Sequence, residues 1–312
     1  MRSTDPSFEA CLAAFPARCV DVASSRRIGY RDAGREAGAA RAAALPVVLL
    51  HGIGSGAASW VHQLEALGTT RRVLAWDAPG YGDSTPVEPV SPQATDYADA
   101  LRGWLDALDI ARCVLVGHSL GAIIAGSFAA AHPQRVAGLA LLSPAGGYGA
   151  ASEAVRVQKR DSRLAMLAEL GPQGLADARS ANMLSATASE PARQWVRRNM
   201  ACIVPGGYAQ ATHLLANADL ARDVACYSRE RARICVAVGT ADRITPPHAC
   251  EHIAQAASVP LQLIAGAGHA GYVEAPETYS TLIDAFCKTC EQQAQPAEQA
   301  EQAEQAQQEA RP

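Results

Sequence analysis

The sequence predicts an α/β fold built on a mostly parallel sheet with helices on both of its faces. Short apolar, β-branched segments alternate with amphipathic stretches over residues 45–144, and this alternation resumes over residues 234–286. Such a pattern is typical of parallel strands joined by crossover helices. The intervening residues 145–230 carry helical patterns only, which indicates a helical insertion into the fold.

The order of the elements follows from the apolar runs. An antiparallel hairpin over residues 18–22 and 27–31 is expected to lead into the parallel strands, and the Ala- and Gly-rich residues 33–44 are expected to form a loop. A helix near residues 279–287 closes the fold. The parallel strands are predicted at residues 47–50, 73–76, 114–116, 139–142, 234–239 and 261–264.

The chain divides into a core, a helical cap and a tail. Residues 1–144 and 231–290 are expected to form the core, and residues 145–230 the cap. Residues 291–312 are Ala/Gln/Glu repeats without bulky apolar side chains, so we expect a disordered tail there, or a loosely helical one. Its removal after Cys290 is therefore expected to leave stability nearly unchanged. The cap helices are predicted near residues 153–170, 175–184, 191–201 and 208–216.

Ser119 lies in the pentapeptide Gly117-His118-Ser119-Leu120-Gly121, between a predicted strand and an apolar stretch of helical length. A strand, a sharp turn and a helix form the context of the Gly-x-Ser-x-Gly nucleophile elbow. The turn holds the serine at an unusual backbone conformation, so the residues two before and two after it must be small. Its hydroxyl is expected to project above the sheet at the positive end of the helix. The alternative is an incidental serine in a Gly-rich turn.

Two later predicted strands end in side chains that can complete a catalytic triad. Asp242 and then His269 follow such strands, which gives the chain order nucleophile, acid, base expected for this elbow. His269 would accept the proton of Ser119, and Asp242 would hold the imidazole in the correct tautomer. The backbone N–H groups of Ile53 and Leu120 are the expected oxyanion donors.

The chain resembles the α/β-hydrolase family over residues 45–286. Within the family it is most similar to ester and enol-lactone hydrolases that use no cofactor, such as 3-oxoadipate enol-lactonase, and it is also similar to carbon–carbon bond hydrolases of aromatic-ring cleavage. The resemblance implies a serine hydrolase without metal or cofactor, and a cap that shapes the substrate pocket. The motifs that carry it are His51-Gly52-Ile53-Gly54, Asp77-Ala78-Pro79-Gly80-Tyr81-Gly82-Asp83-Ser84, the elbow, Gly239 to Asp242, Gly268-His269 and Glu274-Ala275-Pro276-Glu277.

The cap and the loops offer candidates for substrate binding. A cap arginine that faces inward would suit a substrate carboxylate, and Arg179 is the candidate chosen among seven. Ordinary packing is the alternative for each aromatic candidate. These aromatic candidates for the pocket are Trp60, Tyr148, Trp195 and Tyr272.

Several functions share this set of residues. The leading hypothesis is a serine hydrolase of small carboxylic esters or lactones that acts through an acyl-enzyme. A carbon–carbon hydrolase is second, but Ala270 stands where that group usually has tryptophan. A perhydrolase or haloperoxidase without cofactor, and a slow hydrolase that serves as a ligand receptor, would use the same triad. Dehalogenases and epoxide hydrolases need a carboxylate where Ser119 stands.

Composition bears on partners and location. Outside the tail the chain has 26 acidic and 26 basic residues (31 minus 5, and 27 minus 1), so we expect a small-molecule substrate and no binding to nucleic acid or membranes. The sequence leaves open whether the chain forms a homo-oligomer. Nine cysteines, an odd number, indicate reduced thiols, and the first twenty residues lack the apolar core of a signal peptide. The expected location is the cytoplasm.

Overall fold

The computed structural model describes residues 8–22, 26–34, 44–228 and 233–309, which form one eight-stranded sheet with helices on both faces. The strand order is β1-β2-β4-β3-β5-β6-β7-β8. The first two pairings are antiparallel and the other five are parallel, which confirms the predicted mostly parallel α/β fold. The strands are β1 Arg18–Val22, β2 Arg26–Ala33, β3 Val47–Leu50, β4 Val73–Trp76, β5 Cys113–His118, β6 Val136–Leu142, β7 Ile234–Gly239 and β8 Leu261–Ile264.

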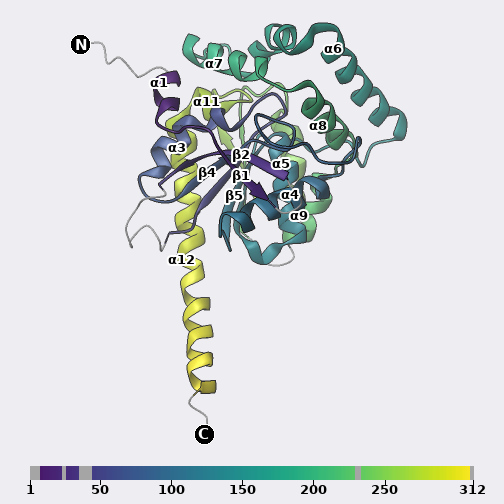
Figure 1. The fold of residues 1–312 in the computed structure, drawn as a ribbon. Helices are drawn as coiled ribbons and strands as arrows, with labels where there is room; N and C mark the ends of the chain where they lie inside the picture. The colour runs from purple at the N-terminus through teal and green to yellow at the C-terminus, as the bar shows by residue number, and fades with distance from the viewer. Residues whose placement is uncertain (1–7, 23–25, 35–43, 229–232, 310–312) are drawn as a thin grey trace, which may run out of the picture.

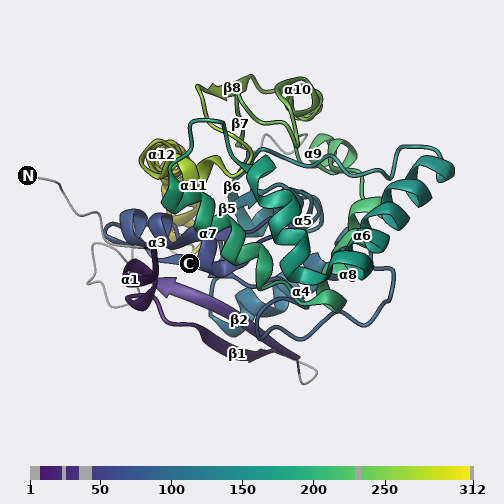
Figure 2. The ribbon, with the colours of Figure 1, turned by 90° about the horizontal axis from the view of Figure 1, so that it is seen from above.

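Helices lie on both faces of the sheet (Figure 2), and each face buries its own apolar cluster. In β3, Val47 and Leu49 belong to one cluster and Val48 and Leu50 to the other, because successive side chains of a strand point to opposite faces. One face carries α1 (Phe8–Ala13), α3 (Val61–Gly68) and α12 (Pro276–Glu309). The other carries α4 (Ala94–Ala107), α5 (Leu120–Ala131), α9 (Leu220–Ser228) and α10 (Pro247–Ala256).

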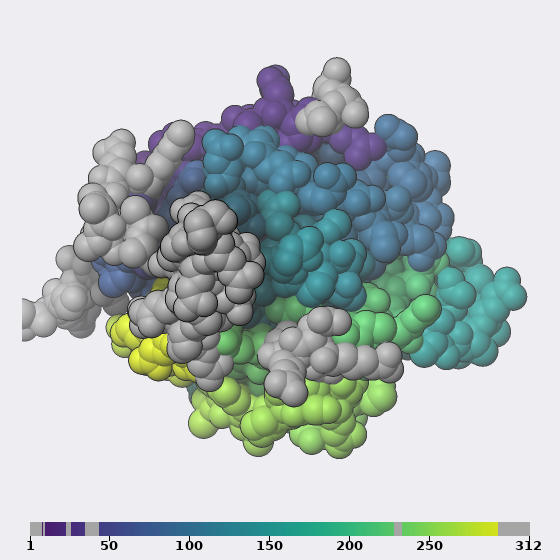
Figure 3. Space-filling model, turned by 90° about the horizontal axis from the view of Figure 1, so that it is seen from below, coloured from purple at the N-terminus to yellow at the C-terminus, as the bar shows by residue number. Residues whose placement is uncertain are grey.

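The inserted helices α6 (Glu153–Arg179), α7 (Glu190–Ala201) and α8 (Pro205–Asn217) gather at one end of the body (Figure 1). The first two expected cap helices are the two parts of α6, whose helical conformation breaks at Gly171 (φ 63°, ψ 179°), just before Pro172. Proline removes a backbone donor and glycine accepts a positive φ, so this pair interrupts the helix. Seen from below, the teal residues of α6 extend past the rim of the core (Figure 3).

One segment differs from the expected division of the chain. Helix α9 falls within the range expected for the cap, but it packs against α5 in the core. Helix α12 continues to Glu309, so residues 291–309 have a helical backbone, which is the second of the two forms expected for the tail. Ala, Gln and Glu are strong helix formers, in keeping with this backbone. The expected loop over residues 33–44 lies mostly outside the described residues, and Ala33 still belongs to β2.

None of the described helices has both the length and the apolar character required to cross a membrane.

Candidate active site

The turn after β5 holds Ser119 in a strained backbone conformation, with φ 53° and ψ −114°. Its N–H donates to the carbonyl of Leu142 on the neighbouring strand (3.1 Å). The backbone around the turn leaves no room for a side chain at Gly117 or Gly121. A Cβ on Gly117 would lie 2.6 Å from Cα of Ala122, and one on Gly121 would lie 2.7 Å from the carbonyl carbon of Leu50. The predicted strand–turn–helix context of the elbow is therefore present.

Asp242 and His269 form a hydrogen-bonded pair that water does not reach. Asp242 Oδ2 lies 2.9 Å from His269 Nδ1, and both side chains are fully buried. Asp242 follows β7 and His269 follows β8, so the parallel order of the two strands brings the side chains to the same edge of the sheet. Because Nδ1 carries the hydrogen that is donated to the carboxylate, Nε2 is left as a base.

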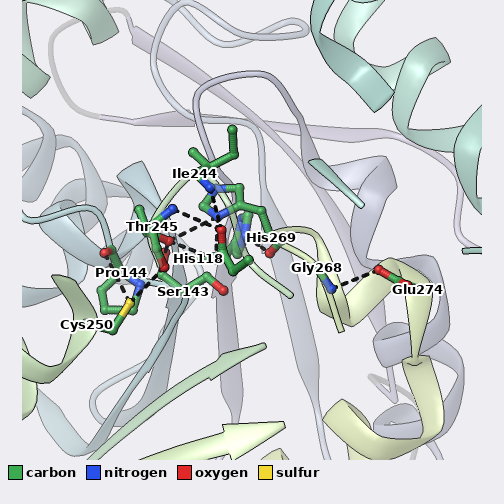
Figure 4. Close-up of polar contacts among 10 residues, drawn as sticks. His118, Ser143, Pro144, Ile244, Thr245, Cys250, Gly268, His269 and Glu274 are labelled. Atoms are coloured by element: carbon green, nitrogen blue, oxygen red, sulfur yellow. Dashed lines mark hydrogen bonds and ion pairs between the residues drawn. The ribbon is translucent and has the colours of Figure 1, made fainter. Parts of the chain in front are cut away.

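The Asp242 carboxylate is held in its charged form by several donors. Oδ1 accepts from the backbone N–H groups of Ile244 (2.8 Å) and Thr245 (2.9 Å), and the Thr245 hydroxyl lies 2.9 Å from Oδ2. Burial raises the pKa of Asp242, but the hydrogen bonds from His269 and these backbone groups outweigh it and lower the pKa to about 2. Figure 4 shows Ile244 and Thr245 gathered next to His269.

Ser119 and His269 line the same cavity, which has a volume of about 680 Å³. His269 Nε2 is buried and makes no hydrogen bond to any described residue. No hydrogen bond joins it to the Ser119 hydroxyl within the described chain. Catalytic hydrogen bonds are often long in enzymes without substrate and shorten in the complex. The cavity therefore brings together the elbow serine and a base oriented by a carboxylate.

Ile53 and Leu120 also line this cavity, and the backbone N–H of neither donates to another described group. The Tyr81 hydroxyl donates to the Ile53 carbonyl (2.8 Å) and so fixes the loop that carries Ile53. His51 braces the same loop. Its Nδ1–H donates to the Gly52 carbonyl (2.8 Å), while its Nε2 accepts from the N–H of Ala78 (3.0 Å). Two unused donors in a fixed loop and at a helix start suit a developing oxyanion.

His118 of the elbow pentapeptide is a positioning residue, a role in keeping with the sequence, which favours loop orientation or packing over proton exchange for it. Its Nε2–H donates to the backbone carbonyl of His269 (2.8 Å), and the two rings lie 4.7 Å apart. Burial, with the nearby His269 as a second cause, lowers the pKa of His118 to about 3. The ring is therefore neutral at ordinary pH and ties β5 to the loop that holds His269. Thr245 was missed, since a hydroxyl three residues after an aspartate carries no sequence signal.

Four of the five candidates for substrate binding line the cavity: Tyr148, Arg179, Trp195 and Tyr272. The expectation for Trp60 is wrong. Its indole is fully buried and stacks on Tyr272, with ring centroids 4.0 Å apart and the planes 25° from parallel. It lies behind the cavity wall because the short helix η1 (Ala57–Trp60) turns it into the core. It thus supports Tyr272 and does not reach the cavity.

The cavity lining is rich in cations. Besides Arg179, the residues Lys159, Arg163 and Arg243 line it, and none of the described aspartates or glutamates does. Arg163 contacts the Tyr208 hydroxyl (3.3 Å), and Arg179 contacts the sulfur of Met166 (3.7 Å). The described residues provide no ion-pair partner for either guanidinium. On the outer face of the cap, by contrast, Arg197 pairs with Asp177 (2.6 Å).

Solved structures of other proteins have the same fold as this chain. An esterase from Thermogutta terrifontis matches with a TM-score of 0.76 at 23% identity, over 88% of this chain and 99% of that one. The enol-lactonase from Burkholderia xenovorans matches with a TM-score of 0.76 at 24% identity, over 87% of this chain and all of that one, 100%. At these identities the likeness concerns the fold.

Curated relatives match over shorter segments. A 2-hydroxy-6-oxononadienedioate/2-hydroxy-6-oxononatrienedioate hydrolase from Paraburkholderia xenovorans is 39% identical over 135 residues, which cover 41% of this chain and 43% of that protein. The abhydrolase domain-containing protein abhd-5.2 of Caenorhabditis elegans is 38% identical over 104 residues, 32% of this chain and 23% of that protein. The matched segments thus span less than half of either relative.

A family model described as the alpha/beta hydrolase family matches residues 47–281, which is most of the chain. This range contains the elbow, the Asp242–His269 pair and every strand of the parallel part of the sheet. The chain therefore belongs to the alpha/beta hydrolase family and has its fold.

Proposed function

We propose that the protein is a serine hydrolase that cleaves a small carboxylic ester or an (enol-)lactone through an acyl-enzyme. The observation that carries the proposal is that His269 lines the same cavity as the elbow serine Ser119, while its other ring nitrogen lies 2.9 Å from the buried carboxylate of Asp242. A lone histidine or serine has many structural roles. A carboxylate, an imidazole and an elbow serine at one cavity have the arrangement that nucleophilic catalysis requires.

The reaction follows from the protonation states. His269 Nε2 accepts the Ser119 proton as the hydroxyl oxygen attacks the carbonyl carbon, and Asp242 stabilises the imidazolium that forms. The N–H groups of Ile53 and Leu120 stabilise the oxyanion, a contribution worth about 2.7–4 kcal/mol per donor in comparable sites. His269 then returns the proton to the leaving alcohol or enol. A water molecule repeats the sequence and releases the acid.

Turnover of p-nitrophenyl acetate and butyrate tests the assignment. Ser119→Ala is expected to lower kcat by a factor of about 10⁴ or more, and to abolish labelling by a fluorophosphonate. Ser127→Ala is the matched control, because Ser127 is a buried serine of α5, the helix that follows Ser119, and does not line the cavity. Full labelling of Ser119→Ala would place the nucleophile elsewhere and refute the proposal.

The cations of the cavity favour a substrate that carries a carboxylate. Arg163 and Arg179 are half-buried, line the cavity and lack an ion-pair partner in the described chain. A guanidinium that is partly desolvated and unpaired is costly unless a ligand neutralises it. A planar carboxylate can accept two hydrogen bonds from one guanidinium. We therefore place the acidic end of the substrate under α6.

Carbon–carbon hydrolysis is the second candidate. It is supported by the relative from Paraburkholderia xenovorans, whose name describes a dioate substrate. Ala270, directly after His269, argues against it, since the resembling hydrolases usually have tryptophan there. Parallel assays with a vinylogous diketo acid and with an enol-lactone of similar size distinguish the two. A kcat/KM at least tenfold higher for the diketo acid would overturn the ester or lactone proposal.

A ligand receptor that hydrolyses slowly would contain the same residues. Its acylation would stop after one equivalent, whereas an enzyme processes the substrate repeatedly. A burst of p-nitrophenol without a steady phase, for every ester and lactone tested, would favour the receptor.

A further inference from the structure

Three side chains from two helices meet on the face of the sheet that α3 and α12 cover, away from the proposed catalytic residues. They are Cys11 of α1, and His62 and Glu65 of α3, and their ligand atoms all lie within 4.8 Å of one another. We propose that they bind a divalent transition-metal ion, with zinc the best fit. The resemblance to hydrolases without cofactor implies no metal. No sequence motif indicates this site, because Cys11 and His62 lie 51 residues apart.

The ligand set selects the metal. A thiolate, an imidazole and a carboxylate are the ligands that zinc uses in proteins, whereas calcium and magnesium require oxygen ligands. In a tetrahedral zinc site, bonds of about 2.0–2.3 Å separate the ligand atoms by roughly 3.4–3.8 Å. The largest separation allowed here, 4.8 Å, therefore closes with shifts of about 1 Å.

The placement of the ligands on the helices supports the same conclusion. His62 and Glu65 are three residues apart and so share one face of α3. Their side chains already approach each other, with His62 Nδ1 3.8 Å from Glu65 Oε2. Cys11 is only 7% exposed and faces α3 from the buried side, while the Glu65 side chain is 57% exposed. The fourth position would thus open towards solvent, where water can fill it.

The site would fasten a short helix to the body. Helix α1 has six residues, and a helix of that length is unstable without tertiary contacts. A metal held by Cys11 and by α3 would cross-link segments that are far apart in the chain, so its binding energy would add to the stability of the fold.

Helix α1, which carries Cys11, also contacts a residue of the substrate cavity. The ring of Phe8 contacts two other aromatic rings. Its centroid lies 4.5 Å from that of His62 and 4.9 Å from that of Trp195 in the cap helix α7, and the planes of Phe8 and Trp195 are 17° from parallel. Trp195 lines the cavity. Metal binding would therefore also restrain one contact between α1 and the cap. The proposal does not depend on the hydrolase assignment and would hold if that assignment failed.

Titration of the metal-stripped full chain with cobalt(II) tests the site. Cobalt bound to a thiolate gives an intense charge-transfer band in the near ultraviolet. We expect this band to saturate at one equivalent and to disappear when zinc is added, since zinc binds such sites more tightly. Zinc should also raise the Tm by a few degrees.

Variants decide whether these three residues are responsible. Cys11→Ser should abolish the band, whereas Cys19→Ser, the control at an exposed thiol, should retain it. Glu65→Gln keeps the shape of an exposed side chain and so should leave the fold intact, while weakening cobalt binding at least tenfold. The proposal is overturned if the full chain shows no thiolate band, if Cys11→Ser retains the band, or if Glu65→Gln binds cobalt with unchanged affinity. A simple ion pair between His62 and Glu65 would give the first of these results.

Discussion

The carboxylate of Glu274 holds the backbone of Gly268, with Oε2 accepting the Gly268 N–H at 3.0 Å. The same oxygen accepts the N–H of Ser185, also at 3.0 Å, from the part of the cap between α6 and α7. His269 follows Gly268 directly, and His118 binds its carbonyl from the other side. Two side chains therefore fix the backbone that carries the proposed base, and one of them also ties this loop to the cap.

Glu274→Gln is expected to reduce kcat/KM by about 10- to 100-fold, because a hydrogen bond to a charged acceptor contributes about 1.5–3 kcal/mol. Most of the loss should fall on kcat, since the loop positions His269 and not the substrate. Glu277→Gln, an exposed glutamate three residues later, is the control. Steady-state kinetics on one ester measures both variants. An unchanged kcat in Glu274→Gln would show that the loop keeps its geometry without this carboxylate.

Arg163→Gln and Arg179→Gln are expected to raise the KM for an anionic ester, such as p-nitrophenyl hemisuccinate, by about tenfold each. A charge-assisted hydrogen bond is worth about that much. The KM for neutral p-nitrophenyl butyrate should stay the same. Arg197→Gln is the control, since Arg197 pairs with Asp177 on the outer face of the cap. Equal changes for the two esters in all three variants would remove the case for an acidic substrate.

His118 predicts a specific dependence of stability on pH. Its pKa is about 3 in the folded protein, against about 6.5 when unfolded, so the unfolded state binds more protons between these values. Stability is therefore highest above pH 6.5 and falls as the pH drops towards 3, by about 1.4 kcal/mol per pH unit from this group. His118→Asn lacks the titrating group but keeps an N–H donor. Urea unfolding of both proteins at pH 7.5, 6 and 5 should show a shallower decline for the variant; parallel declines would contradict the assignment.

Two truncations test where the C-terminal helix stops contributing to the body. Glu291 pairs with Arg71, whose side chain is 3% exposed, and its Oε1 also accepts the N–H of Leu45 at 3.1 Å. The expectation that the chain can be cut after Cys290 without loss therefore conflicts with these contacts. Truncation after Gln292 should leave the Tm unchanged, whereas truncation after Cys290 should destabilise by about 1–3 kcal/mol. Thermal unfolding compares the two, and equal Tm values would show that Glu291 contributes nothing.

Most of the sheet could be predicted because its signal is local. Apolar runs gave five strands with their observed ends, among them Val73–Trp76 and Ile234–Gly239. The elbow and the order of Ser119, Asp242 and His269 were predictable too, since each depends on residues next to a strand. Contacts between distant segments carry no such signal. Helical periodicity did not reveal that α9 packs on the core, or that Trp60 supports Tyr272 from behind.

The side chains that orient the site were the hardest to predict. Arg163 and Arg160 lie on the same helix, but Arg163 lines the cavity and Arg160 pairs with Asp161, and only the packing of α6 decides which one faces inward. Thr245 and Glu274 act through backbone groups and carboxylates that meet only when β7, β8 and the cap are assembled. The type of a residue does not by itself predict which distant groups it contacts in the folded chain.

The cationic cavity has a consequence for the end of the catalytic cycle. Hydrolysis of an ester or lactone leaves a new carboxylate at Ser119, beneath the same arginines that would attract an acidic substrate. A product with two negative charges would then be retained more strongly than the reactant. Departure of the product, and not bond cleavage, would limit the rate at low ionic strength, and added salt would speed it.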